Sequence, residues 1–182
     1  MMTQTYTITA FSENHIGLLN RITIIFTRRN VNIESLTVSE SAISGIHKFT
    51  IVVNETKEKV EKVVSQIEKL VEVLKAFYHP EEEVIHQEIA LYKVPTEALL
   101  ESNTLEATIR QHNARILEVT HEYTVIEKTG HKDETQDLFN KLSKYGVRQF
   151  TRSGRVAITK LREELFSNYL AEIDQRNGII NK

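Results

Sequence analysis

The sequence predicts an α+β protein made of two small domains that share the same order of strands and helices. With 182 residues, 40% of them hydrophobic, the chain is long enough for two domains of roughly 80 residues. Stretches that alternate polar and apolar residues, typical of half-buried strands, are interleaved with stretches whose apolar residues recur every three or four positions, typical of amphipathic helices. This order occurs twice, on either side of the acidic segment 79–83.

The first half reads as strand, helix, two strands, helix and strand. Alternation over Tyr6–Phe11 predicts the first strand, and the period changes to that of a helix after Gly17. The second helix has the clearest apolar stripe of the chain, made of Val60, Val63, Val64, Ile67, Leu70 and Val71. We expect the remaining elements at 31–43 (strand), 47–53 (strand), 56–71 (helix) and 73–78 (strand).

The second half repeats this order after a proline and three like charges that favour a solvated linker. Gly146 is a typical stop for the helix before the last strand. We expect elements at 85–94 (strand), 99–111 (helix), 115–120 and 123–128 (a hairpin of strands), 133–145 (helix) and 147–159 (strand).

Each half therefore pairs one four-stranded sheet with two helices, the βαββαβ or ferredoxin-like arrangement. We expect tandem domains at 4–79 and 85–160, joined by a linker at 80–84. Apolar residues at helical spacing predict a C-terminal helical tail over 161–182. An isolated helix of this length is marginal in water, so the tail is expected to dock on this subunit or on a partner.

Composition narrows the classes of function. A net charge of −2 and a sequence pI near 6.4 disfavour nucleic-acid binding across a broad surface. The chain has no cysteine, which excludes disulfides, thiolate metal sites and cysteine nucleophiles. Neither a signal peptide nor a membrane-spanning stretch is recognisable, so we expect a cytoplasmic protein that does not bind a membrane.

The residues that usually carry chemistry show no catalytic or metal-binding pattern. The six glycines are too dispersed for a phosphate-binding loop, and no nucleophile motif is present. No two of the seven histidines have the spacing that places both on one helical face around a metal; they are His15, His47, His79, His86, His112, His121 and His131. We therefore expect no catalytic residues, no metal and no cofactor on this chain.

Two short segments stand out as candidate binding residues. Asn14, His15, Ile16, Gly17 and Leu18 join the first strand to the first helix, where unpaired main-chain N–H groups and a partial positive charge suit a carboxylate ligand. The Asn14 amide offers a donor and an acceptor, and Gly17 lets the main chain approach a ligand closely. An ordinary helix cap explains the same residues.

The second segment contains Asn32 and Ile33, at the start of the predicted second strand. Asparagine is depleted in strands, so Asn32 is unusual at this position. A turn residue between helix and strand is the alternative explanation.

These two segments carry a resemblance to a known family. The pattern Glu-Asn-x-x-Gly-x-Leu-x-Arg over 13–21 and the run Asn-Ile-Glu-Ser-Leu-Thr-Val over 32–38 strongly resemble the ACT domain of the acetolactate synthase (acetohydroxyacid synthase) small subunit. The likeness continues through Lys69–Leu74, Glu88–Leu91, Arg115–Thr120 and Arg152–Ala157, so it spans residues 4 to about 160.

The resemblance implies a regulatory, non-catalytic subunit of branched-chain amino acid biosynthesis, which activates a catalytic large subunit and mediates feedback inhibition. It implies a homodimer through the ACT domains, with valine (or leucine or isoleucine) bound between two chains. One chain would contribute Asn14, His15, Ile16, Gly17 and Leu18, and the other Asn32 and Ile33. Thiamine diphosphate, flavin (FAD) and magnesium would belong to the catalytic subunit.

Two substitutions depart from the pattern of better-known bacterial members. His15 stands where a small or acidic residue is common, and Asn20 where serine is usual, so both can retune the response to valine. Two alternatives stay open at this point. One is a stand-alone amino-acid-binding regulator of another enzyme or of transcription, and the other is a small enzyme on a ferredoxin-like scaffold.

Overall fold

A computed structural model describes residues 2–101, 103–160, 166 and 168–171. The chain divides into two compact units. The first is Met1–Ile85 together with the segment from Ala157 onward, and the second is His86–Val156. Each unit contains one antiparallel sheet with its own hydrophobic core.

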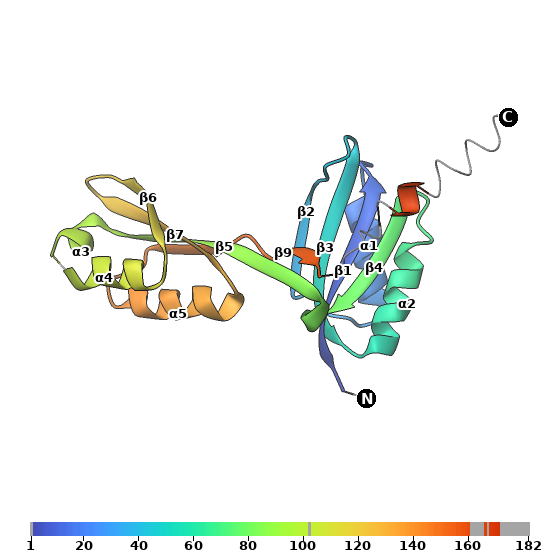
Figure 1. Ribbon diagram of the computed structural model, residues 1–182, viewed down its shortest axis with the longest axis horizontal. Helices are drawn as coiled ribbons and strands as arrows, with labels where there is room; N and C mark the ends of the chain where they lie inside the picture. Colours follow the sequence, from blue (N-terminus) through green and yellow to red (C-terminus); the bar gives the residue numbers. More distant parts are fainter. Residues whose placement is uncertain (1, 102, 161–165, 167, 172–182) are drawn as a thin grey trace. The chain divides into compact units, whose positions relative to one another are not determined.

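The first unit follows the predicted order of elements: β1 (Gln4–Glu13), α1 (Leu18–Arg28), β2 (Ser35–Glu40), β3 (Ile46–Glu55), α2 (Lys57–Ile67) and β4 (Val73–Pro80). The four strands are ordered β2-β3-β1-β4, and α1 and α2 cover one face of the sheet (Figure 1). Strand β1 lies in the middle because it pairs antiparallel with both β3 and β4.

Alternation along β1 separates the two faces of this sheet. Ile8 and Ala10 are fully buried in the core beneath the helices. Thr7 and Thr9 are on the opposite face, because successive side chains of a strand point to opposite sides. Helix α1 completes the core with Leu18, Ile22, Ile25 and Phe26, whereas Leu19, which the sequence predicts on the same apolar stripe, is 48% exposed.

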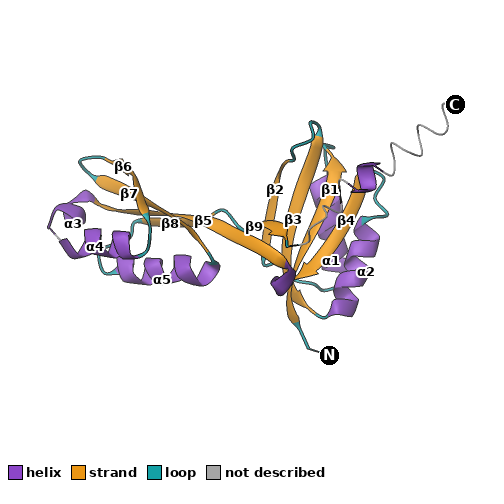
Figure 2. Ribbon diagram, in the orientation of Figure 1, coloured by secondary structure: helices purple, strands orange, loops and turns teal. Residues whose placement is uncertain are grey.

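The elements after β4 are β5 (Val84–Pro95), α3 (Thr96–Glu101), α4 (Asn103–Gln111), β6 (Arg115–Val119), β7 (Tyr123–Gly130), α5 (Lys132–Ser143), β8 (Gln149–Arg152) and β9 (Val156–Thr159). The arrangement is repeated in the second unit, to which all but the first two residues of β5 and only the first residue of β9 belong. Its sheet is ordered β6-β7-β5-β8, which is the strand order of the first sheet. Figure 2 shows α4 and α5 on one face of this sheet. The predicted fold class, two tandem ferredoxin-like domains, is confirmed.

The second helix is shorter than the apolar stripe predicts. Helix α2 ends at Ile67, and Val71 is 93% exposed instead of belonging to the stripe. The chain must reverse within a few residues to enter β4. Main-chain hydrogen bonds between residues three positions apart replace the four-residue spacing of the α-helix. In these, Leu70 N–H donates to Ile67 O at 3.0 Å and Val73 N–H donates to Leu70 O at 3.0 Å.

Three other predicted elements have different bounds. The strand predicted over 31–43 is ordered as β2 only between Ser35 and Glu40, and the helix predicted over 99–111 begins earlier, since helical residues run from Thr96 (α3) and continue as α4 on the other side of position 102, which lies outside the described residues. The last strand, predicted as one element over 147–159, is divided into β8 and β9. Gly154 lies between them with φ +77°, a left-handed conformation that interrupts a strand.

The predicted linker and the end of the second domain also differ from the structure. Residues 80–84 form the end of β4, a short 3₁₀ helix at Glu81–Glu83 and the start of β5. Residues 157–160 belong to the first unit, in which Lys160 N–H donates to Glu83 O at 2.8 Å. The tail predicted over 161–182 lies mostly outside the described residues; Phe166 and residues 168–171 are helical.

The described residues lack two features that would point to other classes of protein. In that part of the chain, no helix is long and apolar enough to cross a membrane. The same residues contain no group of three or more histidine, cysteine or acidic side chains arranged to hold a metal ion.

Candidate functional site

The loop between β1 and α1 holds the first group of candidate residues. Asn14 is exposed, and its main-chain N–H donates to Gly45 O at 3.2 Å, which ties the loop to the turn between β2 and β3. His15 is exposed, with Nδ1 3.0 Å from Ile16 O. Ile16 is 98% exposed, an unusual position for a large aliphatic side chain. The loop therefore presents a polar amide and an apolar side chain to solvent.

Helix α1 begins without a capping side chain. Gly17 occupies the cap position with φ +83°, a conformation that favours glycine, and no acidic residue lies in the first turn. The first N–H groups of a helix have no intrahelical partners, and the helix dipole adds a partial positive charge there. A Cβ atom added at Gly17 would meet no atom within 4 Å, so the approach is open. This helix end can accept a carboxylate.

Leu18 differs from its expected role. Its side chain is 2% exposed and packs in the core with the other apolar residues of α1. Its main-chain N–H donates to His15 O at 3.2 Å. The helical stripe therefore directs this side chain into the core.

Two residues outside the expected set hold this loop in place. Arg21, in the second turn of α1, forms an ion pair with Glu72, and the hydrogen bond from Arg21 lowers the pKa of the Glu72 carboxyl. The carbonyl of Glu72 also accepts the N–H of Glu13 at 3.0 Å, directly before Asn14. Arg21 is part of the 13–21 motif, but Glu72 is distant in sequence and no local pattern identifies it.

The second group of candidate residues lies before β2. Asn32 is exposed, and its Nδ2 donates to Glu34 Oε1 at 2.8 Å. Ile33 is half-buried and packs against the core, while Glu34 N–H donates to Val52 O at 2.8 Å. The Asn32 amide is thereby oriented by its neighbour on a segment fixed to β3.

The two groups lie at opposite ends of the same sheet. Asn14 bonds to Gly45, at the start of β3, whereas the segment with Asn32 bonds to Val52, near its end. Six residue steps separate Ile46 from Val52, about 20 Å at the rise of a strand. One small ligand therefore cannot contact both groups of a single chain.

Comparison with known proteins identifies the family. The family profile described as "AHAS small subunit-like ACT domain" matches residues 8–75, and the profile described as "Small subunit of acetolactate synthase" matches residues 87–161. The chain is 33% identical over 155 residues to a probable acetolactate synthase small subunit of Archaeoglobus fulgidus, covering 85% of this chain and 96% of that protein. The chain belongs to the acetolactate synthase small-subunit family.

Further members of this family are similar over almost the same region. The acetolactate synthase small subunit of Mycobacterium leprae is 33% identical over 156 residues, covering 86% of this chain and 92% of that protein. The crystal structure of the small subunit from Thermotoga maritima superposes with a TM-score of 0.78 at 27% identity, covering 88% of this chain and 99% of that one. All seven candidate site residues lie inside the matched ACT domain.

Proposed function

We propose that this chain is the regulatory subunit of an acetolactate synthase. We further propose that it binds a branched-chain amino acid, of which valine is the main candidate, between the ACT domains of two copies. The observation that carries the proposal is the separation of the two candidate groups within one chain. Asn14 and Asn32 lie on the order of 20 Å apart along β3, so a common ligand requires a second copy.

The strand order supports a particular dimer. Strand β2 is at one edge of the sheet and runs parallel to β1, because both pair antiparallel with β3. If two β2 edges pair antiparallel, the start of one β2 meets the end of the other. Asn32 then approaches the sheet end that carries the partner subunit's Asn14. Unpaired edges favour this kind of association.

The chemistry of the two groups suits an apolar amino acid. The uncapped start of α1 can hold the ligand carboxylate, and the amide oxygens of Asn14 and Asn32 can accept hydrogen bonds from its ammonium. Ile16, which is almost fully exposed in one chain, together with Ile33, can cover an isopropyl or isobutyl group. Leucine and isoleucine fit the same description, so they belong in the test.

Regulation requires that the bound amino acid favour one arrangement of the whole complex over another. We propose that the free subunit stabilises the active form of the catalytic large subunit, which carries thiamine diphosphate, FAD and magnesium. Bound valine then favours an arrangement that is less active.

The test is a reconstitution with the catalytic subunit from the same source. The chain alone should not form acetolactate from pyruvate, whereas its addition should raise the activity of the catalytic subunit. Valine should lower the raised activity, and calorimetry with valine, leucine and isoleucine should rank the three ligands. No change on mixing would remove the regulatory role, and the absence of binding of all three amino acids would remove the effector site.

A further inference from the structure

A cavity of about 230 Å³ lies on the face of the first sheet opposite the two helices. All of its lining residues belong to the first unit, from β1, β3 and β4, from the start of β5 and from the segment after Ala157. None of the candidate effector residues lines it. The cavity is therefore a separate feature from the loop before α1.

Strand register brings the lining side chains together. Thr7 lies directly opposite His79 on β4, and Thr9 lies opposite Phe77. On the other side of β1, Phe11 lies opposite Lys48 of β3. Directly opposed residues share a face of the sheet, so these side chains form one continuous surface.

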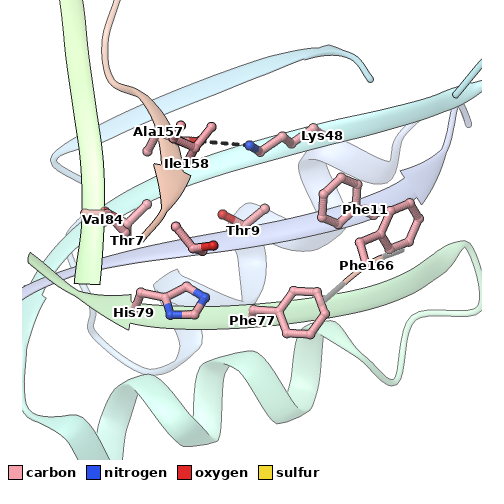
Figure 3. Close-up of a pocket in the computed structure, with 11 residues that line it drawn as sticks. Thr7, Thr9, Phe11, Lys48, Phe77, His79, Val84, Ala157, Ile158 and Phe166 are labelled. Carbon is pink, nitrogen blue, oxygen red and sulfur yellow. Dashed lines mark hydrogen bonds between the residues drawn. The ribbon is translucent and has the colours of Figure 1, made fainter. Parts of the chain in front are cut away.

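One part of the cavity is polar and positively charged. Lys48 Nζ donates to Ala157 O at 2.9 Å, so its ammonium is held at the cavity. His79 is 6% exposed, and its Nδ1 lies 3.1 Å from Glu83 Oε2, which fixes the orientation of the ring. Figure 3 shows the hydroxyls of Thr7 and Thr9 between the Lys48 ammonium and the His79 ring.

The other part of the cavity is apolar and aromatic. The rings of Phe11 and Phe166 stack with centroids 3.9 Å apart and an interplanar angle of 3°. Figure 3 shows Phe11 and Phe166 together at one side of the cavity, and Phe77 between this pair and the His79 ring. A ligand that fills the cavity therefore meets the Lys48 ammonium and the threonine hydroxyls as well as the aromatic rings.

We propose that this cavity binds a small monocarboxylate with an aromatic or branched aliphatic body. Its volume is below the roughly 300 Å³ at which cavities for drug-sized ligands begin, so the occupant is a small metabolite. The carboxylate lies near Lys48 and the threonine hydroxyls, where a charge-assisted hydrogen bond is strong. Among the described residues, no aspartate or glutamate lines the cavity.

The proposal is tested by calorimetric titration of the full chain with phenylacetate and isovalerate. Phenethyl alcohol, which replaces the carboxylate by a neutral hydroxymethyl group, is the control ligand. Each carboxylate that fits should bind at least tenfold more tightly than the alcohol. The ratio of the two carboxylates tells whether the body of the ligand is aromatic or aliphatic.

Variants connect the binding to the cavity. Lys48→Met, which keeps the length of the side chain, should weaken phenylacetate binding about tenfold to a hundredfold and leave the alcohol unchanged. Lys62→Met removes the same charge from the exposed face of α2 and should have no effect. Thr9→Val keeps the side-chain shape without the hydroxyl and should weaken phenylacetate binding severalfold, so it serves if Lys48→Met is unstable.

Competition with valine separates this site from the effector site. Valine should not displace phenylacetate, and Asn32→Ala should leave phenylacetate binding unchanged even if valine binding is lost. The proposal is overturned if neither carboxylate binds more tightly than the alcohol. Displacement of phenylacetate by valine, or normal phenylacetate affinity in both Lys48→Met and Thr9→Val, would also overturn it.

Discussion

Arg21 of α1 and Glu72 of the turn before β4 form an ion pair that joins the start of the first helix to this turn. The carbonyl of Glu72 accepts the N–H of Glu13, so this one residue fixes both the helix and the strand end that enclose Asn14–Gly17. The second carboxylate oxygen of Glu72 is buried and has no hydrogen-bond partner among the described residues. Arg21, which binds the other oxygen, is the main group that favours the ionised form of Glu72.

This pair predicts a pH-dependent contribution to stability. Because Arg21 lowers the pKa of Glu72 from its ordinary value of 4.5, the folded state favours the ionised carboxyl. The resulting stabilisation is present above pH 4.5 and is lost as the pH falls through the lower folded pKa. The midpoint of urea unfolding of wild type should exceed that of Glu72→Gln near neutral pH, and the two should converge in acid.

The control for this prediction replaces the cation. When Arg21→Met is already present, adding Glu72→Gln should no longer change the midpoint of urea unfolding by an amount that falls as the pH is lowered. The assignment of this pH dependence to Glu72 would be contradicted if the difference in urea midpoint between wild type and Glu72→Gln stayed constant from neutral pH down to the acid range.

Gly17→Asp should abolish most valine binding. The substitution places a carboxylate at the uncapped start of α1, where the ligand carboxylate is expected, so valine affinity should fall at least tenfold. The substituted residue must adopt φ +83°, which costs about 1 kcal/mol of folding stability. Calorimetry measures the affinity, and thermal unfolding measures the cost.

Gly17→Asn is the matched control, because asparagine meets the same backbone strain without the charge. Its stability should lie within about 1 kcal/mol of that of Gly17→Asp, which differs only by the interaction of its charge with the helix dipole, while its valine affinity should be much closer to wild type. Equal loss of affinity in both variants would assign the effect to backbone geometry and remove the carboxylate site from this helix end.

Local periodicity was sufficient to predict most of the fold. The apolar stripe of α1 and the alternation along β1 depend on neighbours within a few residues, and both elements formed as expected. The predictions were wrong where contacts between residues distant in the sequence determine the structure. Residues 157–160 join the first unit, where Lys160 bonds to Glu83, 77 positions earlier in the sequence.

The same distinction applies to the candidate site. Asn14, Gly17 and Asn32 are recognisable because their residue types are unusual for their positions, and the structure leaves all three exposed. Leu18 belongs at once to the loop motif and to the apolar stripe of α1, and the stripe prevailed because burial of a leucine side chain stabilises the core by about 2 kcal/mol. The support from Glu72 arises only when β4 packs beside β1.

Asn32→Ala should weaken valine binding about tenfold to a hundredfold. The amide is a polar partner for the ligand, and a hydrogen bond to a charged group contributes roughly 1.5–3 kcal/mol, where 1.4 kcal/mol corresponds to a factor of ten. Glu34→Gln, which keeps an acceptor for the Asn32 amide, is the control and should bind valine within a few-fold of wild type. If Glu34→Gln lost valine binding while Asn32→Ala kept it, the segment before β2 would act through its conformation and not through a contact of the Asn32 amide with the ligand.

A mixed dimer gives the sharpest test of a site shared between two copies. Gly17→Asp damages one half of each site and Asn32→Ala the other, so neither variant alone retains an intact site. In a dimer with one chain of each kind, one site combines both damaged halves and the other combines two intact halves. When the two variants are refolded together and pair at random, half of the dimers are mixed, and one of the two sites in each mixed dimer is intact. Tight valine binding should therefore be recovered at about one quarter of all sites. Recovery of no tight sites, in a sample that sedimentation and tag-specific capture show to contain mixed dimers, would mean that each chain holds its ligand alone, and the dimeric effector site would be abandoned.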